Sequence, residues 1–147
     1  MKITEKTFFI RVISLLLFLT FITPCSAMAV TPDDIQPYAS NYLTAYNTYI
    51  CDVGGEIQIW YEVAGKSKMD DIGVLSIMLY EINSDGSLTW VKTFLHEDYD
   101  SMLAQNDNYI YSYVSCQGSS SKTYKAYVCI WAGKDGSGDT RYMWALE

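Results

Sequence analysis

The chain has 147 residues, of which 50% are hydrophobic and 18% are charged. This composition is typical of one packed domain and argues against both a disordered chain and a multidomain enzyme. The 17 acidic and 10 basic residues give a formal charge of −7. A nucleic-acid partner is not expected, because a phosphate backbone requires a clustered positive surface.

Residues 1–29 have the pattern of an export signal. Three basic residues precede an apolar run at 12–22, which is shorter than the roughly 20 residues that span a bilayer. Small residues predict cleavage after Ala29, with cleavage after Ala27 as the alternative. A lipid anchor on Cys25 is disfavoured, because Pro24 stands where a small residue is normal. We therefore expect a secreted, extracellular domain at residues 30–147, with no membrane attachment after cleavage.

The mature part alternates apolar and polar side chains between turn signals, which predicts strands. In chain order, strands are expected at residues 41–51, 56–63, 72–82, 88–95, 109–116, 123–132 and 140–146. The strand at 56–63 directs Ile57, Ile59, Tyr61 and Val63 to one face. The strand at 72–82 is apolar on both faces, so we expect either a central strand covered on two sides or a strand at a packed interface.

The connections between these strands carry their own signals. Asp85-Gly86 predicts a tight hairpin, and residues 96–103 predict a polar crossover with one helical turn. A Gly-rich turn at 133–138 precedes the last strand. Tyr124 begins an inward-facing set, and its hydroxyl is expected to bond to the preceding loop, as in the tyrosine corner of immunoglobulin-like domains. The sequence thus predicts an all-β, antiparallel two-sheet sandwich of about seven strands, immunoglobulin- or fibronectin-like.

Five stretches of the chain, residues 69–73, 79–81, 90–94, 124–128 and 132–141, resemble a family of short secreted proteins. These proteins come from Gram-positive, largely anaerobic bacteria, and the family is a domain of unknown function. The resemblance covers roughly residues 42–142. It implies export from a Gram-positive cell and a stand-alone domain, and it implies no activity, cofactor or catalytic residue.

Three cysteines remain after signal removal: Cys51, Cys116 and Cys129. At most one disulfide can form among them, and the sequence leaves open both its existence and its pairing. They are not part of the family's pattern. Their spacing matches no zinc site, since the chain contains neither Cys-x-x-Cys nor a second histidine beside His96.

Catalytic signatures are scarce, and we do not expect an enzyme. His96 lies in a loop beside Glu97 and Asp98, without a Gly-x-Ser-x-Gly motif or a cysteine in a catalytic signature. A small glycan hydrolase using Glu97, Asp98 or Asp100 is the least favoured alternative, because a small sandwich offers little wall for a cleft.

Asp135 and Asp139 lie in a Gly-rich segment, where carboxylates and carbonyls could surround Ca²⁺. The segment matches no EF-hand loop, so a plain turn without a cofactor is favoured and calcium is the alternative. Asp139 is alternatively placed to form an exposed ion pair with Arg141 on the same strand face.

The aromatic content is the feature that points to function, because all 13 tyrosines and all 4 tryptophans lie in the mature part. Alternation places several of them on outward faces, where they can bind an extracellular protein or glycan. The candidate ligand-binding residues are Trp60, Tyr111, Tyr127 and Trp131. The structural alternative is that these rings only stabilise the sheets.

We therefore expect a non-catalytic binding module. A secreted antimicrobial or toxin-like effector is the alternative, although a mature charge of about −9 speaks against attraction to anionic envelopes.

Overall fold

The computed structural model describes residues 40–147, which form one antiparallel six-stranded sheet. The predicted signal segment and its cleavage sites lie outside these residues. In chain order, the strands are β1 (Leu43–Val53), β2 (Glu56–Ile82), β3 (Leu88–Leu95), β4 (Leu103–Gln117), β5 (Thr123–Lys134) and β6 (Ser137–Leu146). The predicted all-β antiparallel class is confirmed. Within residues 40–147, no helix has the length and hydropathy needed to cross a membrane.

The strand β2 organises the sheet, because β1, β3, β4 and β5 all pair with it. We predicted separate strands at 56–63 and 72–82, and this is wrong: β2 runs through both without a break. The polar residues between them form a bend, where four residues of β2 are accommodated between the pairs Ala64–Tyr109 and Met69–Asp107. Consequently the structure has six strands, where about seven were expected.

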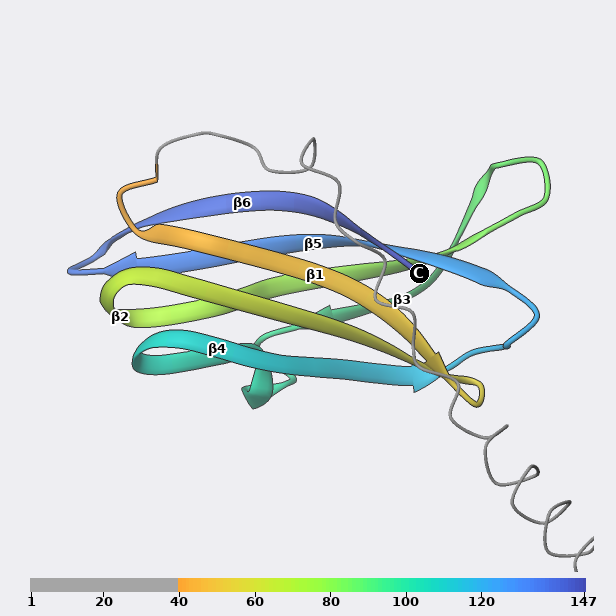
Figure 1. Ribbon diagram of the computed structural model, residues 1–147, viewed down its shortest axis with the longest axis horizontal. Coiled ribbons are helices and arrows are strands. Elements are labelled where there is room, and N and C mark those ends of the chain that lie inside the picture. Colours follow the sequence, from red (N-terminus) through yellow and green to blue (C-terminus); the bar gives the residue numbers. More distant parts are fainter. Residues whose placement is uncertain (1–39) are drawn as a thin grey trace, which may run out of the picture. The chain divides into compact units, whose positions relative to one another are not determined.

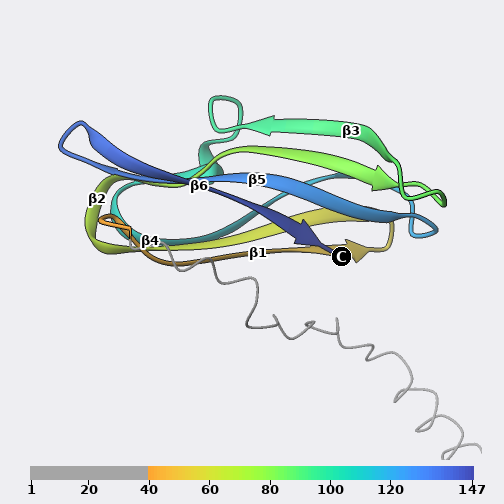
Figure 2. The ribbon, with the colours of Figure 1, turned by 90° about the horizontal axis from the view of Figure 1, so that it is seen from above.

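The bend in β2 curls the sheet into two layers (Figures 1 and 2). The first layer contains β1, residues 56–64 of β2 and residues 109–117 of β4. The second contains β3, residues 69–82 of β2, residues 103–107 of β4, β5 and β6. The apolar 72–82 segment has β5 on one side and β4 followed by β3 on the other, so its expected central position is confirmed.

The core lies between the two layers. On β2, the predicted inward set Ile57, Ile59, Tyr61 and Val63 is fully buried. On β5, the predicted inward set is also buried, from Tyr124 at 3% exposure to Ile130 at 0%. Alternation therefore identified the inward faces of both strands, because one side of each strand packs against the opposite layer.

Turns at two Asp-Gly pairs close the β2–β3 and β5–β6 hairpins, and Gly54-Gly55 closes the β1–β2 hairpin. The predicted hairpin at Asp85-Gly86 is confirmed, since β2 pairs with β3 and Gly86 has a positive φ of 81°. The predicted loop at 133–138 is mostly strand instead. There β5 and β6 continue to the Lys134–Ser137 pair, and only Asp135 and Gly136 turn, with φ of 53° and 74°. These angles suit the two-residue hairpin turn that Asp-Gly favours.

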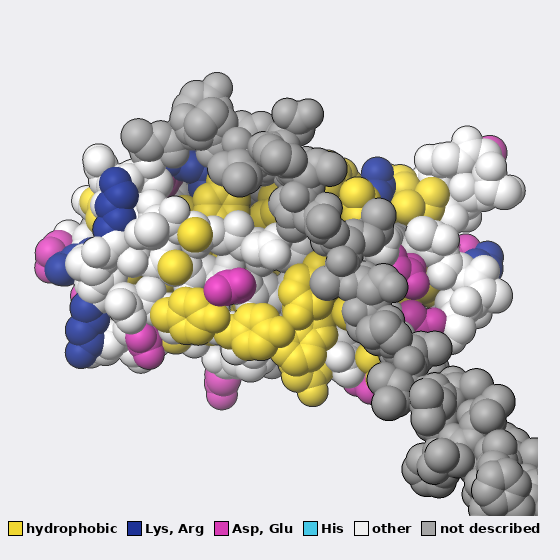
Figure 3. Space-filling model, in the orientation of Figure 1, with side chains coloured by type: hydrophobic (Ala, Val, Ile, Leu, Met, Phe, Trp, Pro, Cys, Tyr) yellow, Lys and Arg dark blue, Asp and Glu magenta, His cyan; other side chains and the backbone are white. Residues whose placement is uncertain are grey.

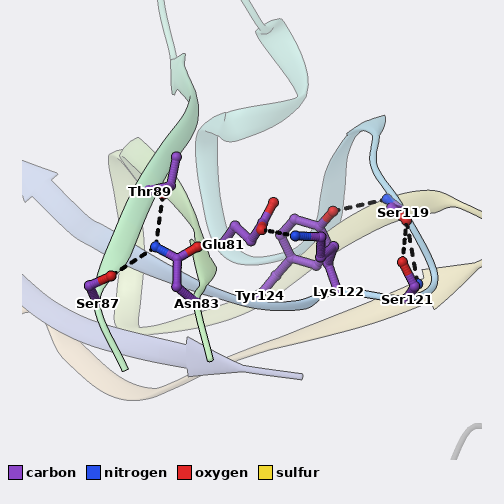
Figure 4. A network of polar contacts seen from close by, with 8 residues as sticks. All are labelled: Glu81, Asn83, Ser87, Thr89, Ser119, Ser121, Lys122 and Tyr124. Atoms are coloured by element: carbon purple, nitrogen blue, oxygen red, sulfur yellow. Dashed lines mark hydrogen bonds and ion pairs between the residues drawn. The ribbon is translucent and has the colours of Figure 1, made fainter. Parts of the chain in front are cut away.

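The loop that precedes β5 is fixed by Tyr124. Its hydroxyl accepts a hydrogen bond from the Ser119 backbone N–H at 2.9 Å, which confirms the predicted contact. In the same region, Lys122 Nζ lies 2.6 Å from Glu81 Oε1 and ties this loop to the end of β2 (Figure 4). The predicted helical turn in the crossover is a 3-10 helix, Asp100–Met102.

Candidate functional site

The outward side of the first layer carries a cluster of aromatic rings, which we call the Trp60 face. It comprises the outward side chains of β1, of residues 56–64 of β2 and of residues 109–117 of β4. Its rings are Tyr49, Trp60, Tyr109, Tyr111 and Tyr113. Figure 3 shows hydrophobic side chains gathered over β2 and β4 on this side, with acidic groups beside them.

Trp60 is the centre of this cluster, because strand pairing places Tyr49 and Tyr113 directly opposite it on the two neighbouring strands. Its ring centroid lies 4.5 Å from that of Tyr113, 5.2 Å from that of Tyr111 and 6.2 Å from that of Tyr49, all in stacked geometry. Each such pair contributes about 0.5–1.5 kcal/mol beyond burial of area. Trp60 is thus half-buried beneath tyrosines that are 36% to 50% exposed.

Hydrogen bonds fix the polar groups of these aromatic side chains. The hydroxyls of Tyr49 and Tyr111 lie 2.8 Å apart and so connect the two outer strands of the layer over β2. The Trp60 indole N–H donates to Gln58 Oε1 at 3.1 Å. Because these contacts use side chains of the face itself, the rings are ordered before any ligand arrives.

Glu62 gives the Trp60 face its electrostatic character. The Tyr109 hydroxyl donates to Glu62 Oε1 at 3.1 Å. Desolvation, followed by the hydrogen bond and the negative charge of Glu62, raises the pKa of Tyr109 above its ordinary value. Glu56 is the second carboxylate of the face, and none of the outward positions in these three segments holds lysine or arginine.

The outward side of the second layer carries another aromatic cluster, which we call the Trp144 face. Its centre is Tyr127, whose ring centroid lies 4.9 Å from that of Trp144 and 5.6 Å from that of Tyr142. Tyr80 adds a tilted ring at 6.0 Å from Trp144. Lys125 Nζ lies 4.3 Å from the Trp144 ring centroid, so a cation of the chain itself already occupies this ring.

The four predicted ligand-binding residues do not form one surface. Trp60 and Tyr111 lie on the Trp60 face, whereas Tyr127 lies on the Trp144 face of the other layer. Trp131 has a structural position, because its indole covers two glycines of the β5–β6 hairpin. A Cβ added at Gly133 would lie 2.6 Å from Trp131 Cζ2, and one added at Gly138 would also overlap the indole. Covering glycine backbone with an aromatic ring stabilises strand pairing.

The sequence interpretation missed the contributions of Tyr49, Tyr142 and Trp144. Tyr142 and Trp144 alternate with buried Ala145 and half-buried Met143 on β6, so the two-residue period was present as a signal. Tyr49 required the register of β1 against β2, because only that register places it opposite Trp60. The signal was the Gly54-Gly55 pair between the two strands, because a two-residue hairpin there gives this register.

The candidate calcium residues make different kinds of contact, Asp139 through its carboxylate and Asp135 through its backbone N–H. Asp139 forms the predicted ion pair with Arg141, but the pair is partly buried on the inward side of β6 and not exposed as expected. The backbone N–H of Asp135 donates to Asp70 Oδ2 at 2.7 Å in the turn. Within residues 40–147, no three His, Cys, Asp or Glu side chains are grouped in a way that could hold a metal ion.

The three cysteines lie in different environments, and no disulfide joins any two of them within the described residues. Cys51 points outward on β1, Cys116 lies on the inner side of β4, and Cys129 is buried on β5 under the Trp144 face. Desolvation raises the pKa of the Cys116 and Cys129 thiols. These two thiols are therefore poor nucleophiles near neutral pH, because the thiolate is the reactive form.

The residues considered for hydrolysis, His96, Glu97, Asp98 and Asp100, are close in sequence and lie in the connection between β3 and β4. The half-buried His96 donates its backbone N–H to the Leu75 carbonyl at 3.0 Å. Glu97, Asp98 and Asp100 are exposed.

Comparison with known proteins identifies no relative of this chain. No family model, curated protein or solved structure matches the chain.

Proposed function

We propose that the protein is a secreted, non-catalytic binding module that recognises an extracellular protein or glycan through the Trp60 face. The observation that carries this proposal is the ordered but exposed set of tyrosines around Trp60. Their hydroxyls and ring edges are held in place by Tyr49–Tyr111 and Tyr109–Glu62 hydrogen bonds, while the rings remain 36% to 50% exposed. Ordered tyrosines bind partners at low entropic cost, which is why they are enriched in recognition surfaces.

Cross-strand stabilisation explains only part of the Trp60 face. Stacking on Trp60 accounts for Tyr49, Tyr111 and Tyr113, because they cover its ring. Tyr109 is different, since it is held through its hydroxyl while its ring is 45% exposed. An exposed aromatic patch bordered by polar groups is typical of an interaction site.

The proposed function depends on the outward face of one layer and does not depend on how the strands connect the two layers. The immunoglobulin- or fibronectin-like arrangement therefore remains a proposal about the fold, supported by the two layers and by the Tyr124 bond to the preceding loop. Membership of the Gram-positive secreted family likewise remains a prediction from the quoted stretches of sequence.

Binding of the purified protein to a glycan array and to a peptide array tests the function. We expect saturable binding on one array, and we expect the double variant Tyr109→Ala, Tyr111→Ala to abolish it. The matched control is Tyr127→Ala, Tyr142→Ala, which removes two tyrosines from the Trp144 face and should leave binding unchanged. No binding on either array, or loss of binding only in the control, would contradict the proposal.

A further inference from the structure

We infer that the Trp60 face selects a cationic ligand, namely a basic segment of an extracellular polypeptide bound in extended conformation. This inference rests on the proposed function and adds the chemistry of the partner. It is drawn from the charges of the two aromatic faces, the contacts of Glu62 and the spacing of the tyrosines on β4.

The two aromatic faces differ in how their charge is balanced. On the Trp144 face, Lys125 Nζ lies 4.3 Å from the Trp144 ring centroid, so the chain supplies its own cation. The Trp60 face has a comparable set of rings and two carboxylates, Glu56 and Glu62, but no lysine or arginine among its outward positions. A ligand that carries an ammonium or guanidinium group supplies the missing charge.

Glu62 marks where that charge binds. It is exposed, and strand pairing places it directly opposite Tyr111, whose ring is 50% exposed. One of its oxygens accepts a hydrogen bond from the Tyr109 hydroxyl at 3.1 Å. An ionised carboxylate has further lone pairs that can accept hydrogen bonds from a ligand. A lysine ammonium placed at Glu62 therefore meets both a carboxylate and the rings of Tyr109 and Tyr111.

The stack around Trp60 disfavours a neutral sugar as the ligand. A sugar ring packs flat on an exposed aromatic face, but tyrosines stack against the Trp60 ring at centroid distances of 4.5 Å and 5.2 Å. What the Trp60 face offers to solvent is phenol groups and carboxylates. These groups suit cations and hydrogen-bond donors.

The spacing on β4 indicates a polypeptide. Tyr109, Tyr111 and Tyr113 occupy alternate positions of one strand, so they repeat every two residues, at about 7 Å. Alternate side chains of an extended peptide repeat over the same distance. A segment with lysine at every second position therefore places successive ammonium groups beside successive rings.

The test uses the peptide Lys-Ser-Lys-Ser-Lys with blocked ends, titrated against the purified protein by calorimetry. We expect Glu62→Gln to weaken its binding at least tenfold. Glu97→Gln is the matched control, because it removes the same charge from an exposed position in the β3–β4 connection, and we expect less than a twofold change. Tyr109→Ala serves as a second variant: it removes the ring beside Glu62 while keeping the carboxylate, and we expect it also to weaken binding of the peptide.

The outcomes separate this inference from the proposed function. Equal weakening by Glu62→Gln and Glu97→Gln would show general attraction to an acidic protein and would overturn the inference. Binding of a neutral oligosaccharide that Tyr109→Ala, Tyr111→Ala abolishes and Glu62→Gln does not would also overturn it, while leaving the proposed function in place. If neither the peptide nor any arrayed ligand binds, both fall.

Discussion

At Gly73 the backbone has a φ of 148°, and a Cβ there would overlap the carbonyl oxygen of Met102. We expect Gly73→Ala to lower the free energy of unfolding by about 2–4 kcal/mol, because both the backbone and its neighbour must shift. Gly86→Ala is the control: its φ is 81°, but its Cβ meets nothing within 4 Å, so only about 1 kcal/mol should be lost. Urea unfolding measures both, and equal losses would show that the Met102 contact is unimportant.

Substitution of Tyr124 tests how much its hydroxyl contributes to the free energy of unfolding. Because its oxygen accepts the Ser119 N–H and its ring is 3% exposed, Tyr124→Phe leaves that amide without its partner. We expect a loss of about 1–2 kcal/mol in the free energy of unfolding. Tyr111→Phe removes an exposed hydroxyl contact and should cost less than about 0.5 kcal/mol. The reverse order in thermal or urea unfolding would refute this reading of the loop.

Tyr61 predicts how stability depends on pH in the alkaline range. Burial raises the pKa of its phenol above the ordinary value of 10.0, although hydrogen bonds to Ser112 and Ser101 oppose this. The unfolded chain therefore loses this proton at lower pH than the folded chain. Its contribution to stability is complete below about pH 10 and is lost as the pH rises above it.

The measurement for Tyr61 is the free energy of unfolding between pH 9 and pH 11. It should fall less steeply for Tyr61→Phe than for the wild type. The wild type and the variant are compared by their difference, because the thiols of Cys116 and Cys129 and the phenols of Tyr109 and Tyr142 also have raised pKa values and act in the same direction. Parallel curves for the two proteins would mean that Tyr61 does not titrate differently in the folded state.

At the scale of elements, the β5–β6 hairpin depends on Trp131. Its indole covers Gly133 and Gly138, so Trp131→Ala should lower the free energy of unfolding by about 2–3 kcal/mol. Trp90→Ala is the control of the same chemistry, because Trp90 is 61% exposed on β3, and we expect less than about 1 kcal/mol. Unfolding by urea decides between them. Equally small losses of stability for the two variants would show that Trp131 does not stabilise the hairpin and would make it a candidate binding residue again.

The edge strand β6 carries an ion pair that was predictable from the sequence. Asp139 and Arg141 form an ion pair on the inward side, opposite Ala132 and Ile130 of β5. Inward-pointing charge on an edge strand opposes pairing with another chain. The sequence pattern predicted the pair, because residues two apart on a strand share a face.

Element boundaries show where sequence reasoning fails. The hydrophobic alternation of β2 and β5 predicted their buried faces, since this pattern is local. The bend of β2 was not predicted, because residues 64–71 are polar and have the composition of a loop. Their strand conformation depends on pairing with β4 and β5, which lie more than 30 residues away.

At the scale of the whole molecule, the same limit applies to the candidate site. The exposed aromatic residues were predictable from composition and alternation, including Trp60 and Tyr111. Their division between two faces was not, because it follows from the curl of the sheet. The burial of Trp60 under its neighbours and the cover that Trp131 gives to two glycines also required the register.

The two faces differ in charge as well as position. The Trp60 face combines rings with carboxylates, and the Trp144 face combines rings with the chain's own Lys125. A ligand that needs both rings and negative charge therefore suits the Trp60 face better than the Trp144 face.

The indole N–H signals of the four tryptophans, followed by two-dimensional NMR during titration with Lys-Ser-Lys-Ser-Lys, test the central claim most directly. Trp60, Trp90, Trp131 and Trp144 each report a different part of the sheet. Our account predicts a saturable shift of the Trp60 signal, because its N–H and its covering tyrosines lie at the site, while Trp131 and Trp144 stay unchanged. A shift confined to Trp144, or no shift at Trp60 at saturating peptide, would contradict it.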